Sequence, residues 1–276
     1  MARDSHDAMT ESPYRDPATA EVYRRVAVPT HFVRPARDLA TMMAVAAGDR
    51  VLDVGTGTGA FASVAAEAVG NSGLSVGLDR AAAMLRASDH SRDHPLVVGE
   101  TPGLPFVDGA FDAVGASFVL PHCRDRASAL ADMTRVCRSG GRVGITAWGA
   151  LPNAAGQLWK RIVDTYVDAD QLQEAFRTMV PWEEWFYLAR NLGRTLEDAG
   201  LTAVHVATRE YTIDISPDDY VLMKKAGVEG RLIRELAGEI AWNDFLRQIS
   251  VEFRERFPGS ITFVRDVHFG VGTKQV

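Results

Sequence analysis

Cysteine is scarce in this chain, which has only Cys123 and Cys137 among its 276 residues. So few thiols exclude a disulfide framework as the organising principle. Neither has a second Cys or a His at metal-ligand spacing, so no metal site is predicted. No run of about 18 apolar residues occurs, so no membrane span is expected. Lys and Arg form no cluster and the net charge is −6, so nucleic acid is disfavoured as a partner.

The composition is that of a globular protein, with 46% hydrophobic and 24% charged residues. The first residues, MARDSHDAMTESPYRD, are polar and acidic rather than basic and then apolar. They predict a disordered tail over 1–16, no signal peptide and a cytoplasmic protein. We expect residues 17–276 to form a single domain, either as a monomer or as a homodimer.

A strand–helix alternation begins at Arg50 and continues for about 100 residues. Buried strands are predicted over 51–54, 74–78, 96–98, 111–118 and 142–147, with helices over 59–69, 81–88 and 126–137. This rhythm indicates an α/β fold with a doubly wound, mostly parallel sheet. Residues 48–150 would form the ligand-binding core of the domain.

The segments around this core have helical patterning. Residues 17–47 read as short helices broken at Pro29 and Pro35, and 151–190 as a helical insertion. In 191–276 we expect a helix over 192–199, a strand over 203–211, a helix starting at Ser216-Pro217, a long helix over 231–257 and a strand over 260–270. The predicted buried stripe of the long helix is Leu232, Leu236, Ile240, Ile249 and Phe253.

The strongest local signal is VLDVGTGTG over 51–59, in which three alternate glycines lie between a strand and a helix. Glycine lets the backbone turn sharply and lets a ligand approach closely, and amides at the helix start face that ligand. Asp79 follows Gly55 by 24 residues, at the end of the second strand, where an acid can accept both hydroxyls of a ribose.

These features alone also permit an NAD-dependent oxidoreductase, because Gly55, Gly57 and Ala60 satisfy a loose G-x-G-x-x-A pattern. Asp53 argues against it, since a carboxylate there would repel a pyrophosphate. A ligand that carries cationic groups and no phosphate suits such an acid better.

Residues 51–148 resemble the class I S-adenosylmethionine-dependent methyltransferases, in particular the group that includes the quinone-pathway C-methyltransferases. The resemblance is carried, in order, by VLDVGTGTG, by LD at 78–79 with ML at 84–85, by GET and LPF over 99–106, by FDAV over 111–114, and by RV at 135–136 with GGR at 140–142. Glu100-Thr101 replaces the family's Asp-Ala, and Ser139 replaces its proline.

The resemblance implies a Rossmann-like seven-stranded sheet with its last strand antiparallel, and S-adenosylmethionine as cofactor with S-adenosylhomocysteine as product. The implied cofactor-binding residues are Asp53, Gly55, Thr56, Gly57, Gly59, Asp79, Arg80, Met84, Glu100, Thr101, Ser117 and Phe118. Asp79 would accept the ribose hydroxyls, Glu100 would lie near the adenine, and Phe118 would lie near the sulfonium.

Methyl transfer from an activated donor needs alignment more than a base, so no catalytic residue is assigned. His122, His31, Tyr14 and Tyr23 are weak candidates for a base. Residues 17–47 and 151–190 would form a lid whose aromatic residues hold an apolar or aromatic small molecule. A macromolecular acceptor, or a binding protein without catalysis, are the alternatives that stay open.

Overall fold

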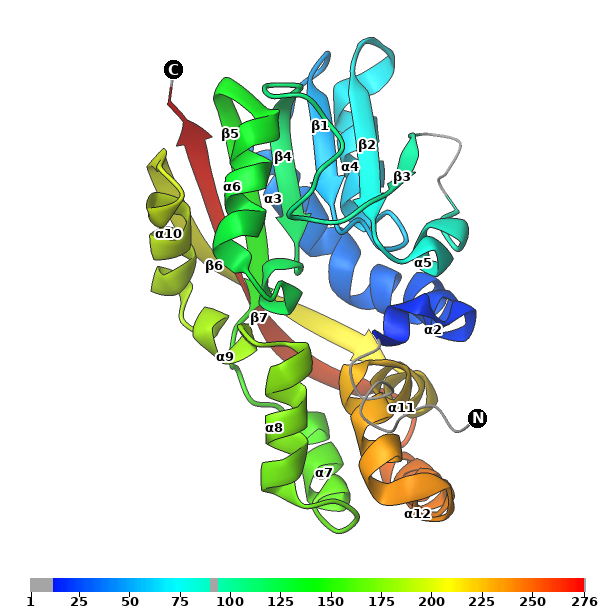
Figure 1. The fold of residues 1–276 in the computed structure, drawn as a ribbon. Coiled ribbons are helices and arrows are strands. Elements are labelled where there is room, and N and C mark those ends of the chain that lie inside the picture. The colour runs from blue at the N-terminus through cyan, green and yellow to red at the C-terminus, as the bar shows by residue number, and fades with distance from the viewer. Residues whose placement is uncertain (1–11, 90–93, 276) are drawn as a thin grey trace, which may run out of the picture.

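The computed structural model describes residues 12–89 and 94–275, built around one seven-stranded sheet (Figure 1). The strands run in the order β3-β2-β1-β4-β5-β7-β6. They are β1 (Arg50–Val54), β2 (Leu74–Asp79), β3 (Leu96–Val98), β4 (Phe111–Ser117), β5 (Cys137–Trp148), β6 (Leu201–Ile215) and β7 (Ile261–Lys274). Only β7 is antiparallel to its neighbours. The predicted fold, with its antiparallel last strand, is confirmed.

Helices cover both faces of the sheet, because the central strands are apolar on both sides. One face packs against α3 (Val33–Met42) and α4 (Ala60–Val69) through residues such as Leu39 and Phe61. The other packs against α6 (Arg126–Val136) and α10 (Ala189–Asp198) through residues such as Leu130 and Leu196. The short elements between strands are η3 (Gly70–Ser72), α5 (Ala82–Arg86) and η4 (Leu120–His122).

The N-terminal segment is one helical run and not the broken set that its prolines predict. It follows η1 (Pro13–Arg15) and comprises α2 (Pro17–Val22), the π-helix η2 (Tyr23–Phe32) and α3. Pro29 lies inside η2, where the N–H of Val33 donates to the carbonyl of Val28, five residues back. The wider π turn accommodates a residue that lacks an N–H and would clash in an α-helix. Pro35 stands in the first turn of α3, where proline is tolerated.

The prediction of a disordered tail over 1–16 is wrong for residues 12–16. Residues 1–11 lie outside the described part of the chain. Residues 12–16 are ordered, because Ser12 and Pro13 are buried and the Asp16 side chain accepts from the N–H of Ala18 to cap α2. Tyr14 packs against Tyr23 and the buried Ala20. This segment therefore belongs to the folded protein.

Strands β6 and β7 are longer than predicted, and they pair from Leu201↔Lys274 to Ile215↔Ile261. Figure 1 shows this ribbon running beyond the other strands to a separate layer of helices. The layer comprises α7 (Ala154–Val163), α8 (Ala169–Met179), α11 (Pro217–Ala226) and α12 (Val228–Arg256). We call it the helical layer. The short helix α9 (Glu183–Phe186) packs on the sheet instead, through Phe186.

The helical layer has its own apolar core, to which the ends of β6 and β7 contribute. Its largest members include Trp159, Phe245 and Phe253. The predicted stripe of α12 is correct except at Ile240, whose side chain is 84% exposed. Gly238 adopts φ 78° and kinks the helix, so the stripe changes direction there. No helix in the described part of the chain is long and apolar enough to cross a membrane.

Candidate functional site

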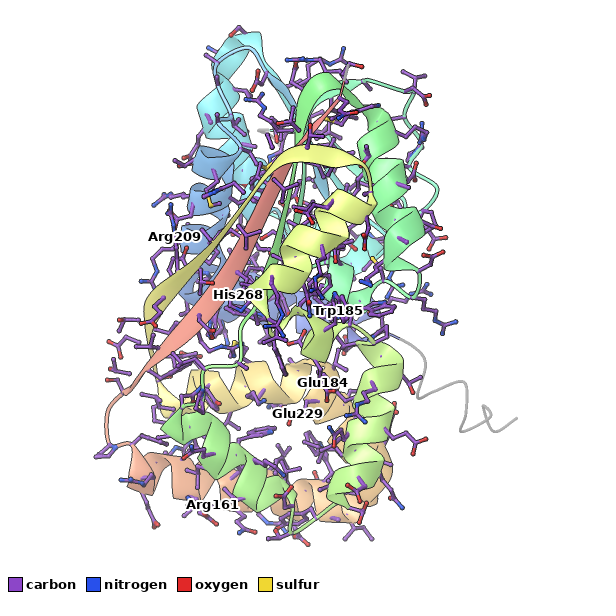
Figure 2. All side chains as sticks on the ribbon, turned by 90° about the vertical axis from the view of Figure 1, so that its left-hand side faces the viewer. Arg161, Glu184, Trp185, Arg209, Glu229 and His268 are labelled. Atoms are coloured by element: carbon purple, nitrogen blue, oxygen red, sulfur yellow. The ribbon has the colours of Figure 1, made fainter. Side chains whose placement is uncertain are left out.

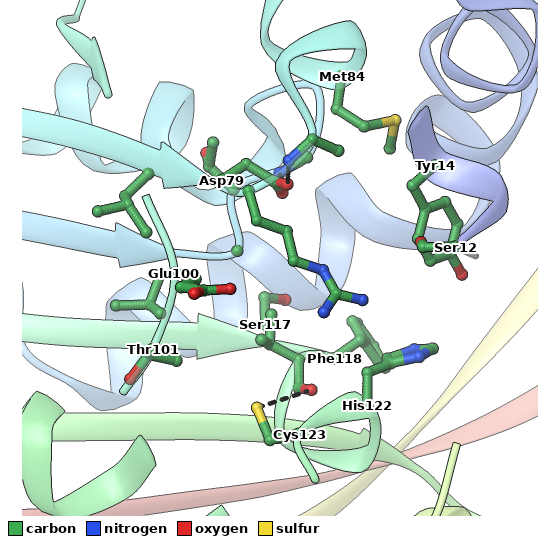
Figure 3. Close-up of a pocket in the computed structure, with 18 of the residues that line it drawn as sticks. Ser12, Tyr14, Asp79, Met84, Glu100, Thr101, Ser117, Phe118, His122 and Cys123 are labelled. Carbon is green, nitrogen blue, oxygen red and sulfur yellow. Dashed lines mark hydrogen bonds between the residues drawn. The ribbon is translucent and has the colours of Figure 1, made fainter. Parts of the chain in front are cut away.

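A cavity of about 520 Å³ opens at the carboxyl ends of β1, β2 and β4 (Figure 3). This edge of a doubly wound sheet is where such folds bind ligands, and the volume lies in the range of small-molecule sites. The predicted cofactor-binding residues that line it are Asp53, Gly55, Thr56, Gly57, Asp79, Arg80, Met84, Glu100, Thr101, Ser117 and Phe118. The structure thus brings together every predicted position except Gly59.

The glycine turn has a backbone that only glycine adopts easily, with φ of 69° at Gly55, 58° at Gly57 and 95° at Gly59. A Cβ on Gly55 would lie 2.5 Å from a methyl carbon of Val119. Gly59 is the N-cap of α4 and faces the side chain of Ser88, not the cavity. The geometry therefore does not support Gly59 as a ligand contact. Its positive φ accounts for the presence of a glycine at this position.

The buried side chain of Asp53 stabilises the glycine turn. Its side chain is 1% exposed, and Oδ2 accepts from the Thr56 hydroxyl at 2.6 Å and from the Ala62 N–H at 2.9 Å. The other oxygen, Oδ1, has no hydrogen-bond partner among the described residues. Burial raises the pKa of Asp53 to about 7. Oδ2 thus stabilises the glycine turn, and Oδ1 remains an acceptor without a partner beside the cavity.

Asp79 connects β2 to the same turn. Oδ2 accepts from the Gly57 N–H and Oδ1 from the Ala81 N–H, both at 2.8 Å. The side chain is half-buried and lines the cavity (Figure 3), and burial raises its pKa. Each oxygen keeps lone-pair capacity for a further donor. A structural role and a ligand-binding role are therefore compatible at this residue.

The side of the cavity predicted for adenine is formed by Met84, Glu100 and Thr101. Met84 is buried under the glycine turn, whereas the Glu100 side chain is exposed. The Thr101 hydroxyl already donates to the carbonyl of Ala129 at 3.2 Å. Of the two residues that replace the family's Asp-Ala, Glu100 has a carboxylate that can accept from a ligand, and the Thr101 hydroxyl has used its proton but keeps lone pairs that can also accept.

An aromatic wall forms the opposite side of the cavity, and we define it as Tyr23, Phe32, Phe118 and Trp148. Phe118 stacks on Trp148 with ring centroids 4.2 Å apart, and Phe32 contacts Phe118 edge-on at 5.2 Å. Phe118 has a φ of 61°, which for a bulky residue costs about 1–3 kcal/mol. Its N–H donates to the backbone oxygen and the hydroxyl of Thr146, which hold it in this strained position.

Of the predicted bases, Tyr14, Tyr23 and His122 line the cavity and His31 does not. The hydroxyls of Tyr14 and Tyr23 are hydrogen-bonded at 3.2 Å, and the Tyr14 ring meets His122 edge-on at 5.9 Å. Burial raises the pKa of both tyrosines and lowers that of His122 to about 4. These tyrosines and the imidazole are therefore neutral at pH 7.

His31 packs behind the wall, against Trp148 and Phe263, and its side chain is 6% exposed. Its Nδ1 shares a hydrogen bond with the Thr30 hydroxyl at 2.7 Å, and burial lowers its pKa to about 3. The structure thus removes His31 from the candidate bases, because it cannot reach a molecule in the cavity.

The aromatic residues predicted to face the acceptor from 151–190 do not line the cavity. Trp159 is 1% exposed and packs on Phe245 inside the helical layer. Trp182 and Trp185 both pack on the guanidinium of Arg126, at 4.1 and 4.7 Å from the ring centroids. This part of the prediction is wrong, because a sequence pattern does not distinguish packing from lining. Thr178 and Met179 of α8, which the sequence did not indicate, line the cavity instead.

A seven-stranded sheet with an antiparallel β7, and a cavity beside its glycine turn, define a Rossmann-like protein of the methyltransferase type. A family model described as "Methyltransferase domain" matches residues 52–145. One described as "Protein-L-isoaspartate(D-aspartate) O-methyltransferase" matches 5–94. Within the described residues, no group of three or more His, Cys, Asp or Glu side chains is placed to hold a metal ion.

Curated relatives carry the name demethylmenaquinone methyltransferase. That of Renibacterium salmoninarum is 30% identical over 198 residues, which cover 62% of this chain and 78% of the relative. That of Mycobacterium sp. (strain KMS) is 37% identical over 119 residues, 43% of this chain and 50% of the relative. The chain spans about half the length of the first such relatives that it matches. It belongs to the class I S-adenosylmethionine-dependent methyltransferases.

Solved structures support the fold alone. A putative methyltransferase from an antibiotic biosynthesis pathway of Anabaena variabilis aligns with a TM-score of 0.59 and 13% identity, over 88% of this chain and 98% of that one. Phosphoethanolamine N-methyltransferase 2 of Haemonchus contortus, in complex with S-adenosyl-L-methionine, aligns with a TM-score of 0.53 and 16% identity, over 100% of this chain and 61% of that one.

Proposed function

We propose that this protein transfers a methyl group from S-adenosylmethionine to a small aromatic acceptor. The observation that carries the proposal is the buried acid at the glycine turn. Asp53 lines the cavity and keeps one oxygen without a partner, which favours a ligand with cationic groups and disfavours a pyrophosphate. The alternative of an NAD-dependent oxidoreductase therefore loses its support.

The residues around the cavity fit this cofactor. Asp79 would accept from the ribose hydroxyls, Gly55 and Gly57 would lie against the methionine half, and Glu100 and Met84 would contact the adenine. When bound, S-adenosylmethionine supplies a methyl group already activated on a sulfonium. The chain's own contribution is then to align the acceptor and to exclude water.

The aromatic wall is the reason for proposing an aromatic acceptor. Tyr23, Phe32, Phe118 and Trp148 present ring faces and edges to one cavity, and a planar ring packs well on such a surface. A quinone-type ring is the natural candidate, since the curated relatives are named for a demethylmenaquinone. A macromolecular acceptor is disfavoured because the aromatic residues lie inside a cavity and not on a flat surface.

A proton leaving the acceptor would be accepted by the imidazole of His122. This side chain lines the cavity and has no hydrogen bond to any residue of the described chain. Its pKa, lowered by burial to about 4, keeps it neutral at pH 7 and makes it a weak base, so it would take a proton only from an acceptor hydroxyl that is itself acidic. Tyr14 and Tyr23, which donate and accept one hydrogen bond between them, would orient an acceptor oxygen.

We also propose that the chain from Ser12 onward acts as one methyltransferase domain. The proposal follows from the β6–β7 ribbon, whose two halves belong to the sheet and to the helical layer. Size-exclusion chromatography with light scattering would decide between monomer and homodimer.

Calorimetry with S-adenosylmethionine, S-adenosylhomocysteine and NAD tests the cofactor, and we expect micromolar affinity for the first two and much weaker binding of NAD. Asp79→Ala should weaken S-adenosylhomocysteine binding about 10- to 100-fold, since hydrogen bonds to a charged group contribute roughly 1.5–3 kcal/mol. Asp198→Ala, at an exposed position on α10, is the matched control. Tighter binding of NAD, or unchanged affinity in folded Asp79→Ala, contradicts the proposal.

Activity is tested with methyl-labelled S-adenosylmethionine and a panel of reduced quinones and phenols. Transfer of label to an aromatic acceptor, and its loss in His122→Ala with cofactor affinity retained, is the expected result. Label appearing only on added protein or nucleic acid would overturn the assignment of a small acceptor.

A further inference from the structure

The chain between β4 and α6 reaches both sides of the cavity. Phe118 belongs to the aromatic wall, the side chain of Val119 fills the space that a Cβ on Gly55 would need, and His122 is the proposed base. Within η4, the His122 N–H donates to the carbonyl of Val119 at 2.9 Å, and the Cys123 N–H donates to a carbonyl at 3.1 Å. A helix of one turn is marginal by itself, so the position of His122 depends on contacts from outside η4.

Trp182 supplies such contacts through two hydrogen bonds. Its backbone N–H donates to the carbonyl of Pro121 at 3.2 Å, and its indole Nε1–H donates to the carbonyl of Arg124 at 3.4 Å. These two carbonyls stand immediately before and immediately after the His122-Cys123 pair in the chain. One residue therefore holds the main chain on both sides of the proposed base, although its own side chain does not line the cavity.

The indole of Trp182 is itself held by a cation. The guanidinium carbon of Arg126, in the first turn of α6, is 4.1 Å from the ring centroid of Trp182 and 4.7 Å from that of Trp185. Arg126 forms no ion pair with any residue of 12–89 and 94–275, and one of its terminal nitrogens is buried there without a hydrogen-bond partner. The two rings are therefore its main partners. Figure 2 shows Trp185 between the helices of the sheet and the helical layer.

Trp182 also follows closely after the end of α8, where Thr178 and Met179 line the cavity. Met179 and Tyr14 pack against one apolar cluster that α8 and α12 form. The Tyr14 ring in turn meets the His122 ring edge-on, with centroids 5.9 Å apart. His122 is thus held through its main chain by Trp182 and contacted at its ring by Tyr14.

We propose that Trp182 is a positioning residue, which fixes the imidazole of His122 relative to the methyl acceptor. This inference rests on the proposed function and adds a residue to it. Proton transfer needs a base within hydrogen-bond reach of the acceptor hydroxyl, and a misplacement of about 1 Å can lower a rate about 100-fold. Because Trp182 does not line the cavity, it acts only through the main chain that carries the base.

Amide hydrogen exchange followed by NMR tests the hold on η4 without any activity. Trp182→Phe removes the indole donor and keeps a ring on Arg126. Exchange of the His122 and Cys123 amides should become about three- to tenfold faster, because one neutral hydrogen bond is lost. Trp185→Phe is the matched control, since Trp185 also stacks on Arg126 but its indole donates no hydrogen bond to the described residues. Its exchange should stay within about twofold of the wild type.

Exchange that Trp182→Phe leaves unchanged, or that both variants accelerate equally, would overturn the proposal. Thermal denaturation of each variant would reveal a general loss of structure.

The pH dependence of turnover tests whether Trp182 acts through the base. With the aromatic acceptor that the wild type methylates, Trp182→Phe should lower kcat at least about threefold at pH 7, with the KM of the cofactor within about twofold. At pH 10 the loss should be under about 1.5-fold, because about half of a phenol is ionised there without a base. Trp185→Phe should follow the wild type at both pH values. A loss that is equal at pH 7 and pH 10 would mean that Trp182 only stabilises the fold.

The two measurements separate this inference from the proposed function. A wild type that transfers no label refutes the proposed function, and faster exchange in Trp182→Phe alone then still shows that Trp182 holds η4. A wild type that transfers label, with equal kcat in Trp182→Phe at pH 7, refutes only the role of Trp182.

Discussion

The two sides of the cavity are constructed differently. The proposed cofactor side is built at the ends of β1 and β2 and in the glycine turn, and its polar contacts are mostly between carboxylates and backbone amides. The acceptor side combines rings from η2, from the end of β4 and from the end of β5, which are far apart in sequence. A chemistry shared by a family can be fixed in a short motif, whereas specificity depends on the assembled fold.

The largest expected effect is on the cofactor side, at Gly55. Gly55→Ala places a methyl group where the side chain of Val119 already lies, at a φ of 69°. Cofactor affinity should fall about 100-fold or more, because the turn must move, and calorimetry would measure it. Gly259→Ala, at φ 96° with no atom within 4 Å of a Cβ, should cost only about 1–2 kcal/mol of stability and leave binding intact. Equal behaviour of the two variants would contradict a steric role for Gly55.

Phe118→Ala tests the acceptor side. Affinity for S-adenosylhomocysteine, which has no sulfonium charge, should stay within about threefold, while turnover with an aromatic acceptor should fall about tenfold because a stacking surface is lost. Phe257→Ala, at the end of α12 away from the cavity, is the control. A loss of S-adenosylhomocysteine affinity larger than the loss of turnover would show that the two sides are not separate.

The pH dependence of the stability of the ligand-free protein should report the titration of the Asp53 carboxyl. Its pKa rises on folding from about 4 to about 7, so the folded state binds more protons between these values and this carboxyl loses stabilising influence as pH rises toward 7. The pKa values of His31 and His122 are lower in the folded state than the unfolded value of about 6.5. Below that pH these two histidines therefore make the free energy of unfolding increase as pH rises, opposite to Asp53.

Comparison with Asp53→Asn removes the histidine contribution, because both proteins contain it. The free energy of unfolding of the wild type, relative to this variant, should decrease from pH 5 to pH 8 in urea titrations. Affinity for S-adenosylmethionine should rise several-fold over the same range, since a cation favours the ionised acid. Parallel pH profiles for the two proteins would show that Asp53 does not titrate there.

The smallest expected effect concerns the lid. Residues 17–47 and 151–190 were predicted to move as units, and η2 and α8 do contribute to the cavity through Phe32, Thr178 and Met179. We expect slower hydrogen exchange in these two helices when cofactor and acceptor bind, with little change in the central strands. Exchange that is already as slow as in β1 and β4, and insensitive to ligands, would mean that they are fixed walls.

Local rules predicted the parts of the molecule that short-range physics determines. The strand–helix alternation predicted the sheet, the glycines and acids predicted residues that line the cavity, and Ser216-Pro217 marked the start of α11, where the Ser216 hydroxyl accepts from the Asp219 N–H. These signals depend on residues that are close in sequence or on neighbouring strands of one regular alternation.

The errors come from long-range packing. Pro29 was read as a break, but packing keeps its helix continuous in a π turn. Trp159 lies in the segment predicted to face the acceptor, yet Lys224 of α11 and Phe245 of α12 pack on its ring. The contact between Arg265 and the indole of Trp148 carries no signal in sequence, since it appears only once β5 and β7 are paired.

The ribbon of β6 and β7 has a consequence for how such a protein can be recombined. Its strands pass without interruption from the sheet into the helical layer, and that layer takes residues from both 154–179 and 213–263. No single cut in the chain separates the layer that supports the acceptor side from the core that holds the glycine turn. Acceptor specificity could be exchanged between relatives only as an interleaved set of segments, with the register of the ribbon preserved.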